Sequence, residues 1–394
     1  MAEQTRWYVP MVARSTDEEH RAATPLELLF DLCFVVAVAQ AAEHLHHDLS
    51  EGHLGHGVAS YLLVFFAIWW AWMNFTWFAS AYDTDDGPYR LTTLVQITGA
   101  LILAAGIPRA FDETDFGIAT LGYVVMRIAM IAQWLRAAWS DRERRPAALR
   151  FAAGIALVQV GWTARLALPE RWFLAGFLVL AAAELLIPIV AERAAPTTWH
   201  PQHITERYGL FTLIVLGETV LASTFAFQSA LDAGAALVSL AAAGIVIVFS
   251  MWWLYFDRPA DELLNSLRTS ILWGYGHYVI FGSAAAVGAG LAVSVDYDTH
   301  HAHVGSLGAG YATAAPVALY LLSVWMLHVC PHQRGLLAAA YPVTAVLVLL
   351  APFGPAPIHV IAGLLAALVA VTVVATRQGA ERARDHHARP AASS

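Results

Sequence analysis

Two carboxylates four residues apart lie at the start of the first long apolar run of this sequence. At that spacing, Glu27 and Asp31 share one face of a helix. Charges this close repel each other, so one acid keeps its proton unless a cation lies between them. The pair therefore predicts either an ion-pair cluster that joins helices or a site for a cation or a proton.

Cations that could complete this pair stand at the ends of other apolar runs. Four arginines are expected at a similar depth in the membrane. A histidine and an acid three residues after it are further candidates. These residues are Arg21, Arg90, Arg207 and Arg268, and His203 with Glu206. The His-x-x-Glu spacing resembles half of a carboxylate–histidine metal pair.

An acidic turn separates the second and third apolar runs. It contains Asp83, Asp85 and Asp86, and Gly87-Pro88 breaks the helix there. These carboxylates could gather cations or bind Arg90, or they could form a solvated turn. Both interpretations stay open from the sequence.

Three ionisable residues fall in the middle of apolar runs, where a charge costs about 2.5 to 3.5 kcal/mol. They are Arg127, Glu218 and His277. Arg127 must meet a carboxylate or water, and Glu184 and Glu218 are the candidates. His277 is either a neutral histidine held by one hydrogen bond or part of a proton relay.

Histidines gather in two connections that are expected on the same side of the membrane. Neutral imidazoles are good ligands for zinc or copper, but the spacings match no structural zinc template. The alternative is a polar loop that uses histidine as a solvating residue. The candidate metal ligands are His44, His46 and His47 in the first connection and His300, His301 and His303 in the second.

Composition places these residues in a membrane. Hydrophobic residues make up 58% of the 394 residues and charged residues only 13%, about half the charged share of a typical soluble domain. The net charge of −8 gives no basic excess, which argues against a nucleic-acid partner. We therefore expect an all-α integral membrane protein whose main partner is the lipid bilayer; homo-oligomerisation is left open.

Twelve apolar segments have the length and character of membrane-spanning helices, for which about 20 residues suffice. Their expected bounds are Leu26–Leu45, Gly57–Ser80, Leu91–Pro108, Phe116–Ala138, Ala147–Leu168, Trp172–Val190, Tyr208–Gln228, Ala233–Phe256, Ser270–Ser294, Ala315–Val329, Gly335–Leu350 and Ile358–Ala375. Several tryptophans near segment ends fit an interfacial aromatic belt. These are Trp69, Trp70, Trp72, Trp77, Trp252 and Trp253.

Arginine distribution predicts the orientation. If both termini are cytoplasmic, the outer connections carry only Arg109, Arg165 and Arg171, and the inner connections and tails carry most of the other arginines. This asymmetry follows the positive-inside rule. The polar N-terminal residues contain no apolar run of the kind that cleavable signal peptides have.

The two halves of the chain resemble each other. In each half a Trp-rich second segment is followed by an acidic loop, an arginine and a Gly/Ala-rich third segment, with Gly99 and Gly106 in one half and Gly282, Gly288 and Gly290 in the other. Six helices per half predicts two parallel repeats. The expected division is a cytoplasmic segment 1–24, repeats 25–195 and 196–376, and a disordered cytoplasmic tail 377–394.

Several motifs together resemble the bacterial low-temperature-requirement A family. They are Thr24-Pro-Leu-Glu-Leu-Leu-Phe-Asp31, Trp69-Trp-Ala-Trp-Met-Asn74 with Asp83-Thr-Asp-Asp86, His203-x-x-Glu206-Arg207-Tyr-Gly-Leu with Leu216-Gly-Glu218, and Trp252-Trp-Leu-Tyr-Phe256. The resemblance covers about Arg21 to Gly290. It implies a multi-pass protein of the bacterial inner membrane linked by name to growth in the cold, without an established biochemical activity.

The layout is also similar, more distantly, to bacterial and lysosomal potassium channels built on a Phe-Ser-Asp motif, although Phe30-Asp31 lacks the intervening serine. The leading expectation is a channel or transporter for a small ion or solute, with a polar path lined by the first and seventh helices. The alternatives are a membrane-embedded metal-handling protein or enzyme, and a structural protein that adjusts the membrane in the cold. A non-enzyme is favoured over an enzyme.

Overall fold

The computed structural model describes residues 7–15, 18, 21–233, 235–331 and 335–388, and within these the side chains of 222–223, 225–233, 236, 336 and 377–388 are not described. The described part is all-helical and contains no strand. The prediction of an all-α protein is therefore confirmed.

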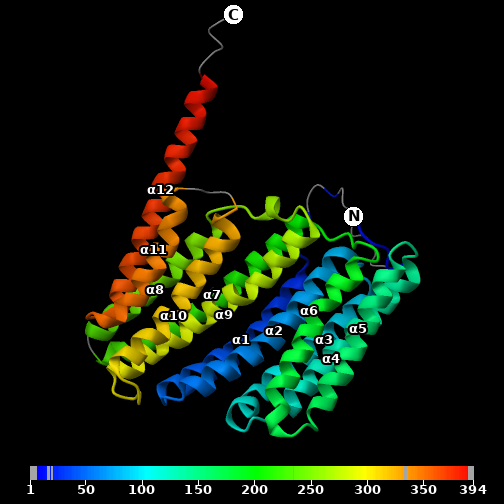
Figure 1. Ribbon diagram of the computed structural model, residues 1–394, viewed down its shortest axis with the longest axis horizontal. Helices are drawn as coiled ribbons and strands as arrows, with labels where there is room; N and C mark the ends of the chain where they lie inside the picture. Colours follow the sequence, from blue (N-terminus) through cyan, green and yellow to red (C-terminus); the bar gives the residue numbers. More distant parts are fainter. Residues whose placement is uncertain (1–6, 16–17, 19–20, 234, 332–334, 389–394) are drawn as a thin grey trace, which may run out of the picture. The chain divides into compact units, whose positions relative to one another are not determined.

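Twelve α-helices follow one another along the described chain (Figure 1). They are α1 Pro25–Ser50, α2 Leu54–Tyr82, α3 Gly87–Asp112, α4 Gly117–Ser140, α5 Arg145–Arg165, α6 Phe173–Glu192, α7 Pro201–Ala233, α8 Ala235–Phe256, α9 Leu267–Asp298, α10 Ser306–Val324, α11 Leu336–Leu350 and α12 Pro357–Ala388. Short 3₁₀ turns occur at Glu170–Trp172, Asp261–Leu263 and Ala351–Phe353, and a π-helical turn at Trp325–Val329 extends α10.

Ten of these helices are long and apolar enough to cross a membrane, counted over the described residues. The two others are α7, whose side chains are described only in part, and α11, which has 15 residues, fewer than the roughly 20 that a bilayer requires. Twelve helices are thus confirmed, and ten of them are candidate spans.

The chain divides into two compact units. The first comprises Met1–His44 and Gly55–Ile214, and the second comprises Leu45–Leu54 and Val215–Ser394. The boundaries lie inside α1, after the first residue of α2 and inside α7. They do not test the repeats predicted at 25–195 and 196–376.

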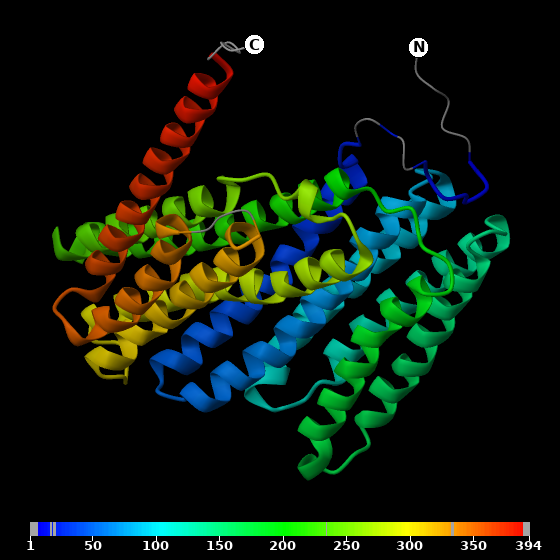
Figure 2. The same ribbon diagram turned by 45° about the horizontal axis from the view of Figure 1, so that its top comes forward.

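In the first unit, α3 and α4 pack closely, and α4, α5 and α6 run side by side (cyan to green in Figures 1 and 2). Gly122 permits the close approach, because a Cβ there would collide with the backbone of Leu103 on α3. Small residues bring membrane helices together in this way.

Three of the four tryptophans of α2 are packed against protein. Trp69, Trp70 and Trp72 are at most 2% exposed, so the expectation of an aromatic belt is wrong for them. An indole is compatible with the membrane interface and with the protein interior, so its hydropathy does not show which of the two it occupies. Trp252 and Trp253 on α8 are exposed at 42% and 43%, as an interfacial position requires.

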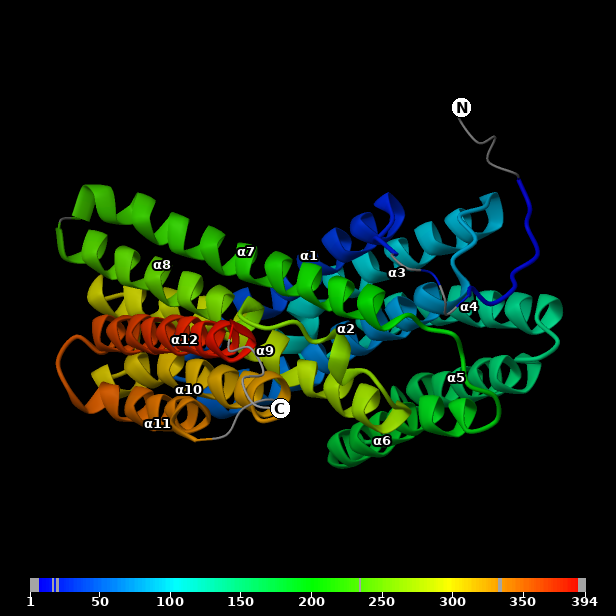
Figure 3. The same cartoon turned by 90° about the horizontal axis from the view of Figure 1, so that it is seen from above.

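In the second unit, α9 packs on α10, while α12 lies along α8 and α11 (Figure 3). The α9–α10 approach again depends on glycine, since a Cβ on Gly290 would collide with the backbone of Ala312. The third helix of each predicted half therefore contacts its successor through glycine.

Candidate functional site

The beginning of α1 is capped by its own side chains. The Thr24 hydroxyl accepts a hydrogen bond from the Glu27 amide at 3.3 Å, and the Glu27 carboxylate accepts one from the Thr24 amide at 2.8 Å. This reciprocal pair is a capping box, and Pro25 suits the first turn that follows. The cap holds Glu27 at the helix end, where a negative charge is favourable.

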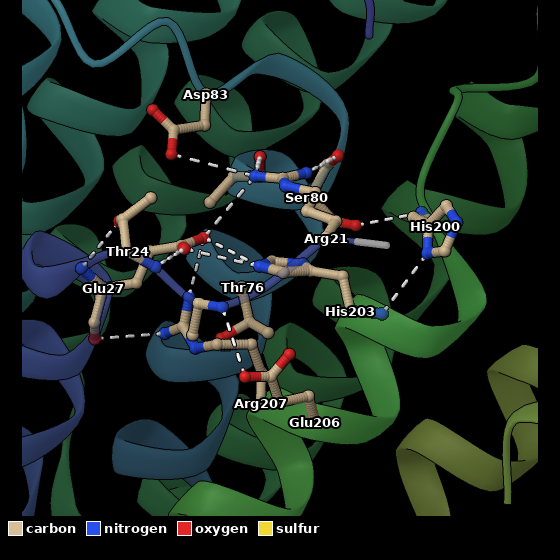
Figure 4. Close-up of polar contacts among 12 residues, drawn as sticks. Arg21, Thr24, Glu27, Thr76, Ser80, Asp83, His200, His203, Glu206 and Arg207 are labelled. Atoms are coloured by element: carbon tan, nitrogen blue, oxygen red, sulfur yellow. Dashed lines mark hydrogen bonds and ion pairs between the residues drawn. The ribbon is translucent and has the colours of Figure 1, made fainter. Parts of the chain in front are cut away.

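Arg207 on α7 binds both acids of α1, and Figure 4 shows it beside Glu27. Its Nη1 lies 3.0 Å from Glu27 Oε1, while Nη2 and Nε donate to the two oxygens of Asp31 at 2.6 and 3.1 Å. All three side chains are fully buried. The predicted pair of carboxylates therefore meets a cation, and the cation is Arg207.

Arg21 adds a second guanidinium to the same cluster. Its Nη2 lies 3.8 Å from Glu27 and 3.7 Å from Asp83. The guanidinium also donates to the carbonyls of Ala79 and Ser80 near the end of α2. Cations favour helix C-termini because carbonyls lack partners there, so Arg21 ties the segment before α1 to the end of α2.

His203, one turn before Arg207, faces the same carboxylate. Its Nε2 lies 3.3 Å from Glu27, and in the described part of the chain its buried Nδ1 has no hydrogen-bond partner. Glu206 is half-buried beside them and accepts a hydrogen bond from the Ala23 amide at 3.3 Å. The His-x-x-Glu spacing thus sends the two side chains to different partners.

Trp72 completes the coordination of Asp31. Its indole nitrogen donates to Asp31 Oδ1 at 2.7 Å, and its ring stacks on Phe211 at a centroid distance of 4.3 Å. A buried indole N–H needs an acceptor, which fixes Asp31 and α2 to each other.

The cluster carries one more acid than guanidiniums. Glu27, Asp31 and Asp83 face Arg21 and Arg207, and the other titratable groups around them are His203, Tyr89 and the half-buried Glu206. Burial, aided by the charge of Glu27 and opposed by Arg21, raises the pKa of Asp83, in the turn after α2, to about 6. One proton on Asp83 or on His203 neutralises the cluster. Chemically, the arrangement can take up and release a proton.

Residues 22–375 match the family described as bacterial low temperature requirement A protein (LtrA). The chain belongs to this family. It is 27% identical over 360 residues to an uncharacterized protein, RA0937, of Rhizobium meliloti (strain 1021), covering 83% of this chain and 81% of that protein. No solved structure matches, so the similarity to potassium channels stays a prediction from sequence.

The family match and the apolar helices identify a multi-pass membrane protein. The match includes every member of the cluster except Arg21. The opening motif of the resemblance supplies Glu27 and Asp31, and its third motif supplies His203 and Arg207.

Other predicted residues of this LtrA-family protein lie elsewhere. Arg90 is exposed and pairs with Asp85 at 2.7 Å, within the turn itself. Arg268 is exposed near the start of α9, and Glu218 is half-buried on α7; both belong to the second unit. Among the described residues, no ion pair joins Arg90 to the α1 carboxylates.

Arg127 lies in a second buried network of the first unit. Its Nη2 lies 3.4 Å from Glu184 on α6, one of the two partners expected from the sequence. Glu184 also accepts hydrogen bonds from Trp70 at 2.8 Å, Trp162 at 3.2 Å and Tyr123 at 3.4 Å. Four donors around one carboxylate hold it in a single orientation.

His277 is buried between hydrogen-bond partners in the second unit. Its Nδ1 lies 2.8 Å from the carbonyl oxygen of Trp273 and its Nε2 3.0 Å from the hydroxyl of Tyr255. The ring of His328, in the π-helical turn, lies 5.6 Å away. These contacts favour a neutral, structurally held imidazole.

The predicted metal-binding histidines contact acids mainly in pairs. His46 meets Asp296 at 2.6 Å, His303 meets Glu51 at 2.9 Å, and His44 lies 3.7 Å from Asp112. His47 and His300 are exposed, and His301 contacts Thr299. In the described part of the chain, no three His, Cys, Asp or Glu side chains converge as a metal site requires, so this prediction gains no support from the geometry.

Sequence reasoning missed the role of the tryptophans. Trp72 binds Asp31, and Trp70 and Trp162 bind Glu184. The signal was available, because an indole buried beside an intramembrane acid will donate to it. The sequence alone did not show which indoles are buried.

Proposed function

We propose that this protein is a channel or transporter for a small ion or solute, controlled by protonation of the cluster of Arg21, Glu27, Asp31, Asp83, His203 and Arg207. The observation that supports this function is the group of three buried carboxylates facing two guanidiniums. Ionisable residues within membrane helices are costly, and they are retained mainly where they serve transport or proton relay.

The mechanism follows from the shared contacts of Arg21. With Asp83 ionised, Arg21 is attracted to both Asp83 and Glu27, which lie 3.7 and 3.8 Å away. Protonation of Asp83 removes one attraction and leaves Arg21 to Glu27 and the carbonyls at the end of α2. As the pH falls, the contact between Arg21 and Asp83 would therefore weaken, while the contacts of Arg21 with the end of α2 would remain.

The expected setting is the inner membrane of a bacterium with both termini in the cytoplasm. The arginine asymmetry supports this orientation. Two parallel six-helix repeats are part of the proposal, and the glycine-mediated contacts of α3 with α4 and of α9 with α10 support them. A path along α1 and α7 is proposed because both helices contribute to the cluster.

The competing function is a purely structural cluster that locks α1, α2 and α7 together. It uses the same contacts, so only flux measurements separate it from transport. Purified protein would be placed in liposomes with K⁺, Na⁺, Cl⁻ or proton gradients in turn. Asp31→Asn and His203→Gln alter the cluster, and Glu113→Gln serves as a matched control because Glu113 pairs with exposed Arg109.

Transport predicts flux of at least one of these ions above that of empty vesicles, reduced in D31N and H203Q and unchanged in E113Q. Wild-type vesicles indistinguishable from empty ones for every ion would overturn the proposal. Equal flux in wild type and in correctly folded D31N and H203Q would overturn the role of the cluster.

A further inference from the structure

Arg165, the last residue of α5, is a buried arginine that pairs with no carboxylate among the described residues. The residue is only 3% exposed. Within the described part of the chain it has no ion pair, and its Nε and Nη1 have no hydrogen-bond acceptor. Arg21, Arg127 and Arg207 are equally buried, and each has an acid within 4 Å.

Aromatic rings surround the Arg165 guanidinium. The ring centroids of Phe173, Trp162, Phe116 and Phe177 lie 4.1, 5.3, 5.4 and 5.6 Å from its central carbon. Ring faces stabilise a cation, but they do not replace an acceptor for the N–H groups. Buried donors without an acceptor are costly, so this site is incomplete as it stands.

A narrow cavity of about 40 Å³ adjoins the guanidinium. Its walls come from α2 to α6 and are mostly apolar, with Leu63, Ala67 and Ile107 among them. Tyr123 and Trp162 also line it, and both donate to Glu184. The cavity therefore combines apolar walls with a single unpaired cation.

The cavity lies far from the ionic cluster along α2. Thirteen residues separate Ala67 from Ser80, whose carbonyl binds Arg21, which corresponds to roughly 20 Å of helix. Exposed apolar side chains flank the Arg165 end, including Leu166 at 46%, Trp172 at 54% and Leu174 at 55%. In a multi-pass protein these side chains would face lipid.

We propose that this cavity binds the head of an amphiphilic anion, a carboxylate or phosphate group carried on a hydrocarbon chain. The carboxylate or phosphate oxygens accept hydrogen bonds from Arg165, and their negative charge balances that of the guanidinium. The cavity holds the carboxylate or phosphate group, and the hydrocarbon chain lies against the exposed apolar side chains. The anion can come from a free fatty acid or from an anionic phospholipid.

The test uses purified protein in nanodiscs of neutral phosphatidylcholine. The probe is dodecanoate brominated beside its carboxylate, and the matched neutral probe is the corresponding brominated dodecanol. Bromine quenches indole fluorescence on contact, and Trp162 lies next to Arg165. A Trp162→Phe variant assigns the signal among the 14 tryptophans.

We expect saturable quenching by the acid and weaker, non-saturable quenching by the alcohol. Arg165→Gln should weaken binding of the acid by about tenfold or more, because a hydrogen bond to a charged group is lost. The exposed Arg171, at the same end of the bundle, supplies the control, and Arg171→Gln should bind as wild type does. Equal affinity in wild type and R165Q, or equal quenching by acid and alcohol, would overturn the proposal.

A second variant guards against misfolding of R165Q. Ala67→Leu narrows the cavity from α2 and keeps Arg165, so it should also weaken binding; unchanged binding in A67L would contradict a site in this cavity. Replacing phosphatidylcholine with phosphatidylglycerol separates the sources. Competition with the brominated acid identifies a phospholipid head as ligand, and absence of competition identifies a free carboxylate.

Discussion

Arg207 binds Asp31 through two parallel hydrogen bonds, from Nε to Oδ2 at 3.1 Å and from Nη2 to Oδ1 at 2.6 Å. Such a bidentate contact fixes both distance and orientation. Because the two residues lie 176 positions apart, one pair holds the beginning of α7 against the beginning of α1. The third guanidinium nitrogen of Arg207, Nη1, lies 3.0 Å from Glu27 Oε1.

Replacing Arg207 by methionine should destabilise the protein by about 3 to 5 kcal/mol, because buried Asp31 loses its cation and Glu27 keeps only Arg21, 3.8 Å away. Arg207→Lys should recover only part of this, since an ammonium cannot make the bidentate contact. The measurement is the free energy of unfolding in mixed micelles. Arg90→Met, which removes the exposed pair with Asp85, should cost about 1 kcal/mol or less; equal losses in R207M and R90M would refute the ranking.

Asp83 should make stability depend on pH in a defined direction. Its pKa rises from 3.8 to about 6 on folding, so the folded state holds the proton more tightly than the unfolded state. The stabilising contribution is therefore complete below about pH 4 and is lost as the pH rises through 6. At about 1.36 kcal/mol per unit, the change is on the order of 3 kcal/mol.

Thermal unfolding of wild type and Asp83→Asn between pH 4 and 7 checks this prediction. As the pH rises, wild type should lose stability relative to Asp83→Asn. A difference that stays constant across this range would show that Asp83 does not titrate there.

Glu184→Gln should destabilise the first unit by several kcal/mol, because Arg127 is left buried without its counter-charge. Removing both charges in the double variant Arg127→Met with Glu184→Gln should restore part of the loss. A double-mutant cycle measured by chemical unfolding gives the coupling energy. Additive single effects would mean that the 3.4 Å contact contributes no coupling.

Gly122→Val should disrupt the packing of α3 on α4, since a Cβ at that position collides with the Leu103 backbone. Overpacking of this kind costs about 1 to 3 kcal/mol or more. Gly363→Ala on α12 is the control, because a Cβ there has open space and alanine favours helix. Thermal stability that falls in G363A as much as in G122V would contradict the close approach.

The sequence by itself determined the helices and one side of the site. The alternation of long apolar runs with turns such as Gly87-Pro88 indicated the all-α class, and the four-residue spacing put Glu27 and Asp31 on one helix face. Helical period and apolar length are local properties, so they can be read from neighbouring residues. The need of Arg127 for an acid also followed, because a lone guanidinium in an apolar run must be paired.

Only the tertiary structure decided which partners meet. Of the four arginines offered for the α1 acids, Arg21 and Arg207 bind them, whereas Arg90 binds Asp85. The sequence also did not predict the burial of Trp69, Trp70 and Trp72. Nor did it predict that Arg165 has no partner within the described chain. The physical reason is that a membrane accepts the same apolar face toward lipid or toward another helix, so composition cannot show which face is covered or which charge lies across from it.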